Sequence, residues 1–358
     1  MKYYLKIIFI LTYISIFPQE YSLLLGIGYD NNCKIGDNID AGSMQYLKTL
    51  CITTENDSLK IIADIPEIIL QRDTTYWRIG IKRSVYNNEI EDQLWLRPLN
   101  EEPEIKGIEV YRGETCEGFE EYKINFVNEN YIVVYSGGGG YCVGNAHPSF
   151  WYDYYWIQFD ALNNKYDWIG DIALEIPNDL PKIFNQNFFN SFLEDGKKIY
   201  DSLDEESKWA LEEVPSKIYL YRQNGKWRTG GEYYWSCEVA RGMTEEFEVT
   251  KLPTSNFIGT DELSISWDTI KTYIPNAVDA FTSPDGKILV VNSGHSFSLY
   301  KLFNSQIPST PSLTYDVQGF EVNVVMIKWF KNDGNTCSFY KKLSDDFFQY
   351  QYNIYGPF

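Results

Sequence analysis

Residues 217–227 read Lys217-Ile218-Tyr219-Leu220-Tyr221-Arg222-Gln223-Asn224-Gly225-Lys226-Trp227. Residues 218–221 of this stretch are β-branched, aliphatic or aromatic, and such types are enriched in strands because they pack well on a pleated, half-buried surface. Asn224 and Gly225 supply the positive φ angles that a tight hairpin turn needs. The stretch therefore predicts a β-hairpin.

Comparable short runs recur along the chain with turn residues between them. A second hairpin is indicated by Pro284-Asp285-Gly286, which lies between Ala280-Phe281 and an apolar run that begins at Ile288. The runs are four to ten residues long and rich in β-branched or aromatic side chains, which is typical of strands. They occupy residues 59–65, 76–82, 93–96, 122–126, 131–135, 154–159, 217–221, 287–291 and 320–329.

One region has helical spacing. Between residues 180 and about 211, apolar side chains recur every three to four positions, as on one buried face of a helix. These residues are Leu180, Ile183, Phe184, Phe188 and Phe192. We expect Asp195-Gly196 to break this helix, and a second short helix to run over residues 205–213, before Pro215. The fold class predicted is α+β, β-dominant, with antiparallel sheet and one or two helices around residues 180–213.

Composition agrees with a large packed core. The chain has 358 residues, of which 44% are hydrophobic and 17% aromatic, so a disordered chain is excluded. There is no fixed repeat and no Pro/Ser-rich linker. We expect one compact domain over residues 21–358, or two closely apposed ones divided near residues 105–120.

The chain is strongly acidic, with a net charge of −19 and a pI near 4.6. Such a field repels phosphate backbones, so no nucleic acid partner is expected. Acidity also keeps a Tyr-rich surface soluble, and that is the simpler explanation of the charge. Cationic ligands, calcium and basic proteins stay open as partners.

The N-terminus has the pattern of an export signal. Lys2 and Lys6 precede an apolar run of about eleven residues, over positions 7–17, which suits a signal peptide and is too short for a spanning helix. We therefore expect residues 1–20 to be a signal peptide, the mature chain to have no membrane span, and the protein to be periplasmic or secreted.

The chain contains six cysteines, and an even number in an exported chain argues for disulfide bonds. They are Cys33, Cys51, Cys116, Cys142, Cys237 and Cys337. Closeness in sequence suggests Cys33 with Cys51 and Cys116 with Cys142, which leaves Cys237 with Cys337. Six cysteines allow fifteen pairings, so other connectivities stay open.

Residues 135–148 read Tyr-Ser-Gly-Gly-Gly-Gly-Tyr-Cys-Val-Gly-Asn-Ala-His-Pro, and residues 156–160 read Trp-Ile-Gln-Phe-Asp. This segment resembles the Gly-Gly-Ala-His-Pro-like turn and following strand of bacterial extracellular domains of unknown function. Such domains occur in the lysozyme-sensing anti-sigma factor and beside some polysaccharide deacetylases. The resemblance covers about residues 124–192, and the chain departs from the pattern at residues 143–145 and by adding Cys142. It implies an exported α+β module that binds a component of the cell envelope.

No motif specifies a reaction, a cofactor or a metal, and none of the three is expected. The glycines at residues 137–140 lack the Lys and Ser/Thr of a phosphate loop, which favours a glycine-lined turn or bulge. Cys142 and His147 could form a thiolate–imidazole pair, but a half-cystine is the simpler reading of Cys142. The acidic residues 201–206 lack the spacing of a calcium loop, and Asp204 is expected to cap a helix there.

The densest aromatic cluster, over residues 150–156, is the candidate binding site. On a strand, Tyr152, Tyr154 and Trp156 line one face. Packing of both faces into the core is the simpler alternative; an exposed face could stack on sugar rings or bind a protein. We expect a binding module for an envelope glycan or protein. A carboxylate-dependent extracellular hydrolase and a structural envelope module are the alternatives.

Overall fold

The structure is a computed structural model that describes residues 21–35, 39–86, 89–99, 116–142, 149–159, 184–211, 214–234, 244–251, 262–331 and 335–355. Strands dominate it, with a few helices, so the predicted β-dominant α+β class is confirmed. The predicted signal segment, Cys237, His147 and the turn at residues 143–148 lie outside the described residues.

Two sheets form the centre of the molecule. The first is antiparallel, in the order β17-β1-β2-β3, and is built from β1 (Tyr21–Ile35), β2 (Ile39–Glu55), β3 (Ser58–Ile65) and β17 (Phe320–Lys331). The second has six strands in chain order: β4 (Ile68–Arg72), β5 (Thr75–Tyr86), β6 (Glu89–Pro98), β7 (Cys116–Val127), β8 (Tyr131–Cys142) and β9 (Ser149–Gln158). Only β6 and β7 pair in parallel within this sheet. Strand β6, which ends before residues 105–120, and strand β7, which begins within them, therefore share one sheet.

Two smaller antiparallel sheets flank this centre. One contains β10 (Lys217–Gln223), β11 (Lys226–Tyr234) and β12 (Thr244–Glu248), and the other contains β13 (Asp279–Thr282), β14 (Ile288–Asn292), β15 (Ser296–Lys301) and β16 (Leu313–Asp316). Both predicted hairpins are confirmed. Gln223 pairs with Lys226 around Asn224 (φ 54°) and Gly225 (φ 77°), and β13 pairs with β14 around the second predicted turn.

The described helices are α3 (Gln186–Ser202), α4 (Glu205–Ala210), α6 (Trp267–Tyr273) and α7 (Asn335–Tyr355). The predicted break at Asp195-Gly196 is wrong, because α3 continues through both residues. Gly196 lets the helix approach its neighbours: a Cβ there would lie 2.8 Å from Pro215 and 3.0 Å from the Phe247 ring. Asp204 caps α4 by accepting a hydrogen bond from Ser207 N at 2.7 Å, as predicted.

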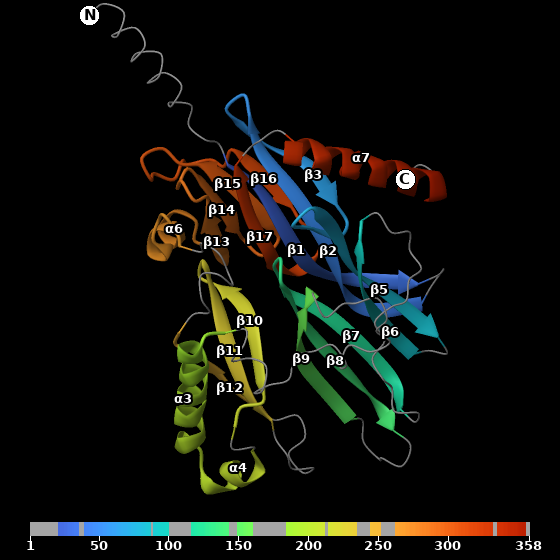
Figure 1. Cartoon of the computed structure of the whole chain (residues 1–358), viewed down its shortest axis with the longest axis vertical. Helices are drawn as coiled ribbons and strands as arrows, with labels where there is room; N and C mark the ends of the chain where they lie inside the picture. The colour runs from blue at the N-terminus through green and yellow to red at the C-terminus, as the bar shows by residue number, and fades with distance from the viewer. Residues whose placement is uncertain are drawn as a thin grey trace, which may run out of the picture.

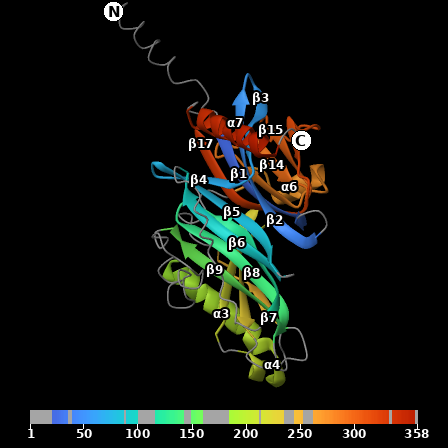
Figure 2. The ribbon, with the colours of Figure 1, turned by 90° about the vertical axis from the view of Figure 1, so that its right-hand side faces the viewer.

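Three apolar cores join the sheets, and Figures 1 and 2 show the layers. The first core lies between the β17-β1-β2-β3 sheet, the six-stranded sheet and α7. The second lies between β7–β9, α3 and the β10–β12 sheet, and the third between the β17-β1-β2-β3 and β13–β16 sheets. Strands β1 and β2 are thus covered on both faces, and so are β7–β9. Among the described residues, no helix combines the length and apolar character needed to cross a membrane.

The glycines at residues 137–140 do not form the expected turn or bulge. They lie within β8, and the ladder passes through them in regular register to β7 on one side and β9 on the other. Glycine is tolerated there because neighbouring side chains occupy the space: a Cβ on Gly137 would lie 2.5 Å from the Tyr135 hydroxyl.

The β1–β2 ladder tests the predicted disulfide between Cys33 and Cys51. Cys51 lies opposite Leu24, whereas Cys33 lies nine residues further along β1. At about 3.3 Å per residue the two positions are roughly 30 Å apart, and a disulfide requires Cα atoms within about 7 Å. The pairing of Cys33 with Cys51 is therefore wrong. Cys116 lies opposite Cys142 in the β7–β8 ladder, and their bridge stays a prediction.

Candidate functional site

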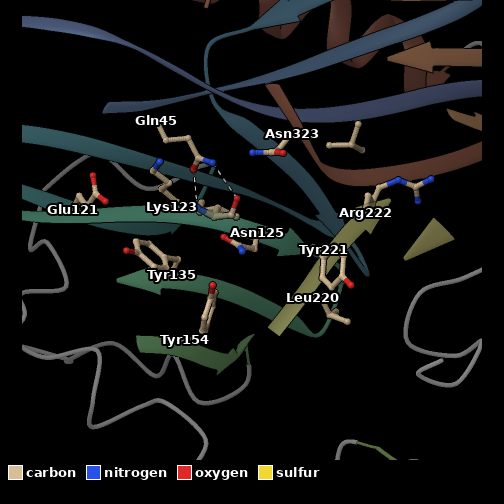
Figure 3. A pocket seen from close by; sticks show the side chains of 12 residues that line it. Gln45, Glu121, Lys123, Asn125, Tyr135, Tyr154, Leu220, Tyr221, Arg222 and Asn323 are labelled. Carbon is tan, nitrogen blue, oxygen red and sulfur yellow. Dashed lines mark hydrogen bonds between the residues drawn. The ribbon is translucent and has the colours of Figure 1, made fainter. Parts of the chain in front are cut away.

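A polar, tyrosine-rich pocket opens where three sheets meet. Its volume is about 280 Å³, and its walls come from β7, β8 and β9, from β10, and from β2 and β17. Figure 3 shows the side chains that surround it. They are Gln45, Glu121, Lys123, Ile124, Asn125, Tyr135, Tyr154, Leu220, Tyr221, Arg222, Asn323 and Val324.

One wall is a row of side chains across three strands. Lys123 of β7 lies opposite Tyr135 of β8, which lies opposite Tyr154 of β9. The two tyrosine rings meet edge to face with centroids 5.5 Å apart. The adjacent row carries Glu121, Gly137 and Tyr152. Because Gly137 has no side chain, the Tyr135 hydroxyl extends over its backbone.

A second aromatic wall comes from β10. Tyr154 stacks on Tyr219 with ring centroids 4.6 Å apart and an interplanar angle of 20°. Tyr219 in turn contacts Tyr221 at 5.8 Å. Tyrosines from two separate sheets therefore form one continuous aromatic surface beside the pocket.

Gln45 sets the shape of β7 at the pocket. The β7–β8 register shifts between Ile124 and Phe126, and such a bulge leaves backbone groups without a ladder partner. Gln45 is 3% exposed, and its side-chain amide hydrogen-bonds to both backbone groups of Ile124. Its Oε1 accepts from the backbone N–H at 2.7 Å, and its Nε2 donates to the backbone carbonyl oxygen at 3.2 Å. The bulge thereby places Asn125 in the pocket wall (Figure 3).

Both cations of the pocket are paired with buried carboxylates. Lys123 Nζ lies 2.7 Å from Asp30 Oδ2, and Arg222 Nε lies 2.6 Å from Asp279 Oδ2. Arg222 also donates to the backbone oxygen of Ala280 at 3.0 Å. These partners hold both cations in place and neutralise their charge, so the pocket offers little net attraction to an anion.

Several polar groups of the pocket, by contrast, are available to a ligand. Within the described part of the chain, the Glu121 carboxyl, the Asn125 amide and the hydroxyls of Tyr135 and Tyr154 make no hydrogen bond. Burial raises the pKa of the Glu121 carboxyl. Burial likewise raises the pKa of Tyr154, so its hydroxyl is neutral near pH 7 and can both donate and accept.

A buried ion pair supports the tyrosine wall from behind. Lys217 Nζ lies 3.6 Å from Glu232 Oε1, and both side chains are nearly inaccessible to solvent. The Tyr152 hydroxyl donates to Glu232 Oε1 at 2.6 Å, and Lys217 lies over the Tyr152 ring at 3.8 Å. Burial raises the pKa of the Glu232 carboxyl. In the described structure its Oε2 atom has no hydrogen-bond partner.

The three predicted binding residues have different places in the structure. Tyr152, Tyr154 and Trp156 do share one face of β9, and Tyr154 lines the pocket. Tyr152 lies behind it, bonded to Glu232. Trp156 is fully buried in the second core and donates from Nε1 to the Ile218 oxygen at 2.7 Å. Trp156 therefore serves the core, and its assignment to the binding surface is corrected.

Most of the pocket was not indicated by the sequence. Tyr219 and Tyr221 belong to the hairpin that identified the fold. Glu121 precedes the predicted strand over residues 122–126 and Lys123 lies within it, but no local pattern relates them to Tyr154. Only the packing of separate sheets brings these side chains together. Among the described residues, no group of three His, Cys, Asp or Glu side chains is placed to hold a metal ion.

Comparison with known proteins adds no relative: no family model, curated protein or solved structure matches the chain. The resemblance of residues 124–192 to bacterial extracellular domains therefore stays a prediction.

Proposed function

We propose that the chain is an exported binding module that holds a neutral sugar ring of an envelope glycan in the pocket. The observation that carries this proposal is the set of unbonded polar groups beside aromatic rings, namely Glu121, Asn125, Tyr135 and Tyr154. Binding sites typically combine apolar or aromatic walls with a few convergent polar groups.

A sugar suits this set of groups chemically. Its C–H faces pack on aromatic rings, and its hydroxyls need partners that both donate and accept. Tyrosine hydroxyls and the Asn125 amide provide both, while the Glu121 carboxylate accepts from two hydroxyls at once. The paired state of Lys123 and Arg222 favours a neutral ligand over an anionic one.

The N-terminal pattern supports a periplasmic or secreted location, where envelope glycans are accessible. A protein ligand that inserts a polar side chain into the same pocket is the alternative partner. A purely structural module would present a large apolar surface without a concave site; the pocket supports a binding role instead.

The test is a glycan array followed by calorimetry on the chain without residues 1–20. The double substitution Tyr135→Phe/Tyr154→Phe retains both rings and removes two hydroxyls, each worth about 1 kcal/mol, so the Kd should rise at least tenfold. Tyr273→Phe is the matched control, because Tyr273 is 64% exposed and absent from the pocket wall. Absence of glycan binding, or equal weakening by the control, would contradict the proposal.

A hydrolase is the second candidate, because Glu121 lines the pocket and burial raises the pKa of its carboxyl, which favours the protonated form. A carboxyl in its protonated form can act as a general acid in glycoside hydrolysis. The panel of bound oligosaccharides would then be cleaved by the wild type and left intact by Glu121→Gln. Binding without cleavage would reject this candidate and leave the binding module.

A further inference from the structure

Two buried cysteines from opposite ends of the chain face each other in the first core. Cys51 of β2 is fully buried, Cys337 of α7 is 7% exposed, and their sulfur atoms lie 3.9 Å apart although 286 residues separate them in sequence. The structure holds both as thiols.

Contacts other than the one between the two sulfur atoms hold α7 against the sheets. Tyr340 of α7 is fully buried, and Phe339 of the same helix stacks on Tyr76 of β5 with ring centroids 3.9 Å apart. One turn further along, the Ser344 hydroxyl accepts from Asp64 N at 3.3 Å and donates to Asp64 O at 3.2 Å. Figure 2 shows the helix lying across the sheet that contains β3. Docking of α7 therefore brings the two sulfurs together without any covalent constraint.

We propose that Cys51 and Cys337 form a disulfide that joins β2 to the C-terminal helix. A bond requires the sulfurs to approach to about 2.05 Å, which is a movement of about 2 Å that side-chain rotation can supply. This pairing replaces both Cys33–Cys51, which the ladder excludes, and Cys237–Cys337. It rests on the α7 contacts alone and is independent of the pocket's ligand.

The chemistry is a thiol–disulfide exchange with a disulfide donor, either a protein oxidase or a small disulfide such as oxidised glutathione. The Cys337 thiolate attacks one donor sulfur, which gives a mixed disulfide and releases one donor thiolate. The Cys51 thiol then loses its proton and attacks the Cys337 sulfur, releasing the second donor thiolate. Two electrons pass to the donor, and the two protons released by the cysteines are balanced by protonation of the donor thiolates.

Burial determines when this exchange occurs. A donor cannot reach sulfurs that are nearly inaccessible, so both exchange steps occur during folding, before α7 is fully docked on β2, and complete docking then buries the bond. Once formed, the bond is shielded from reductants by the same packing. The disulfide is therefore expected in protein folded in an oxidising compartment.

The experiment is peptide mapping of the chain secreted into an oxidising compartment and alkylated under denaturing conditions without reductant. We expect the peptides containing Cys51 and Cys337 to be recovered as one cross-linked species. Cys337→Ala should release Cys51 for alkylation. Ser344→Ala is the matched control, because it removes the hydrogen bonds between α7 and the backbone of Asp64 and keeps both sulfur atoms. This variant should retain the cross-link.

A second measurement separates the bond from packing. Reductant should lower the urea midpoint of the wild type more than that of the Cys51→Ala/Cys337→Ala double variant, which lacks this bridge. Recovery of both cysteines alkylated in wild-type protein, or linked to other cysteines, would overturn the proposal. So would an equal effect of reductant on the two proteins.

Discussion

Replacing Trp156 by Phe should destabilise the fold and leave ligand binding intact. Trp156 is fully buried, its Nε1 donates to the Ile218 oxygen at 2.7 Å, and its ring meets Phe184 at 5.1 Å. Phenylalanine keeps an aromatic ring but leaves that carbonyl without its partner, at a cost of about 1–3 kcal/mol. The vacated space adds about 1 kcal/mol. The free energy of unfolding should fall by about 2–4 kcal/mol.

Urea unfolding followed by far-UV circular dichroism measures this difference. With a urea dependence of about 3 kcal/mol per molar for a large domain, the midpoint should fall by about 1 M. Trp77→Phe is the matched control, because Trp77 is half-buried and its indole makes no hydrogen bond within the described residues; it should cost under about 1 kcal/mol. Equal midpoints for the two variants would refute the reasoning. Loss of glycan binding by folded Trp156→Phe protein would show that Trp156 contacts the ligand.

Three further substitutions test the site and its support. Burial opposes ionisation of Asp195, yet hydrogen bonds from Lys198 and Thr250 outweigh it and lower its pKa to about 2. Asp195→Asn should therefore cost about 2 kcal/mol at pH 7, and in paired urea titrations the difference should shrink progressively as the pH falls from about 5 toward 2. Gly137→Ala places a Cβ 2.5 Å from the Tyr135 hydroxyl, so the ring must move, and calorimetry should show weaker binding of the selected glycan; unchanged affinity would separate Tyr135 from the ligand. Lys217→Met leaves the buried Glu232 carboxylate without its partner, so the free energy of unfolding should fall by about 3–5 kcal/mol. A change below about 1 kcal/mol in urea unfolding would show that the Glu232 carboxyl is already neutral.

Strands that contain a local sequence signal, such as a turn pair or a run of β-branched residues, could be predicted. The Asn224-Gly225 turn was predictable because its positive φ angles depend on two adjacent residues. Strand β2 gave no comparable signal, because both of its faces are covered: Leu47 and Cys51 point into the first core, whereas Leu50 points into the third. A strand buried on both faces shows no alternation of apolar and polar residues.

The pocket was predictable only in part for a similar reason. The aromatic strand β9 marked one wall correctly, since Tyr154 lines the cavity. The sequence of β9 could not show that Trp156, which follows Tyr154 by two residues on the same face, is buried in the core beneath α3 and β10. The alternation of side chains along a strand assigns each one to a face of the sheet. How deeply each side chain is buried, however, depends on which sheet packs over that face. Tyr219 and Gln45 reach the site through such packing between sheets.

The position of β1 has a consequence for how the chain is made. Strand β1 lies between β2 and β17, and its ladder with β17 joins Tyr21 to Lys331. All residues between β1 and β17 must therefore be synthesised before β1 can gain its second neighbour. Pairing over such a sequence separation is slow to nucleate, so the nascent chain spends its synthesis with an unfinished central sheet.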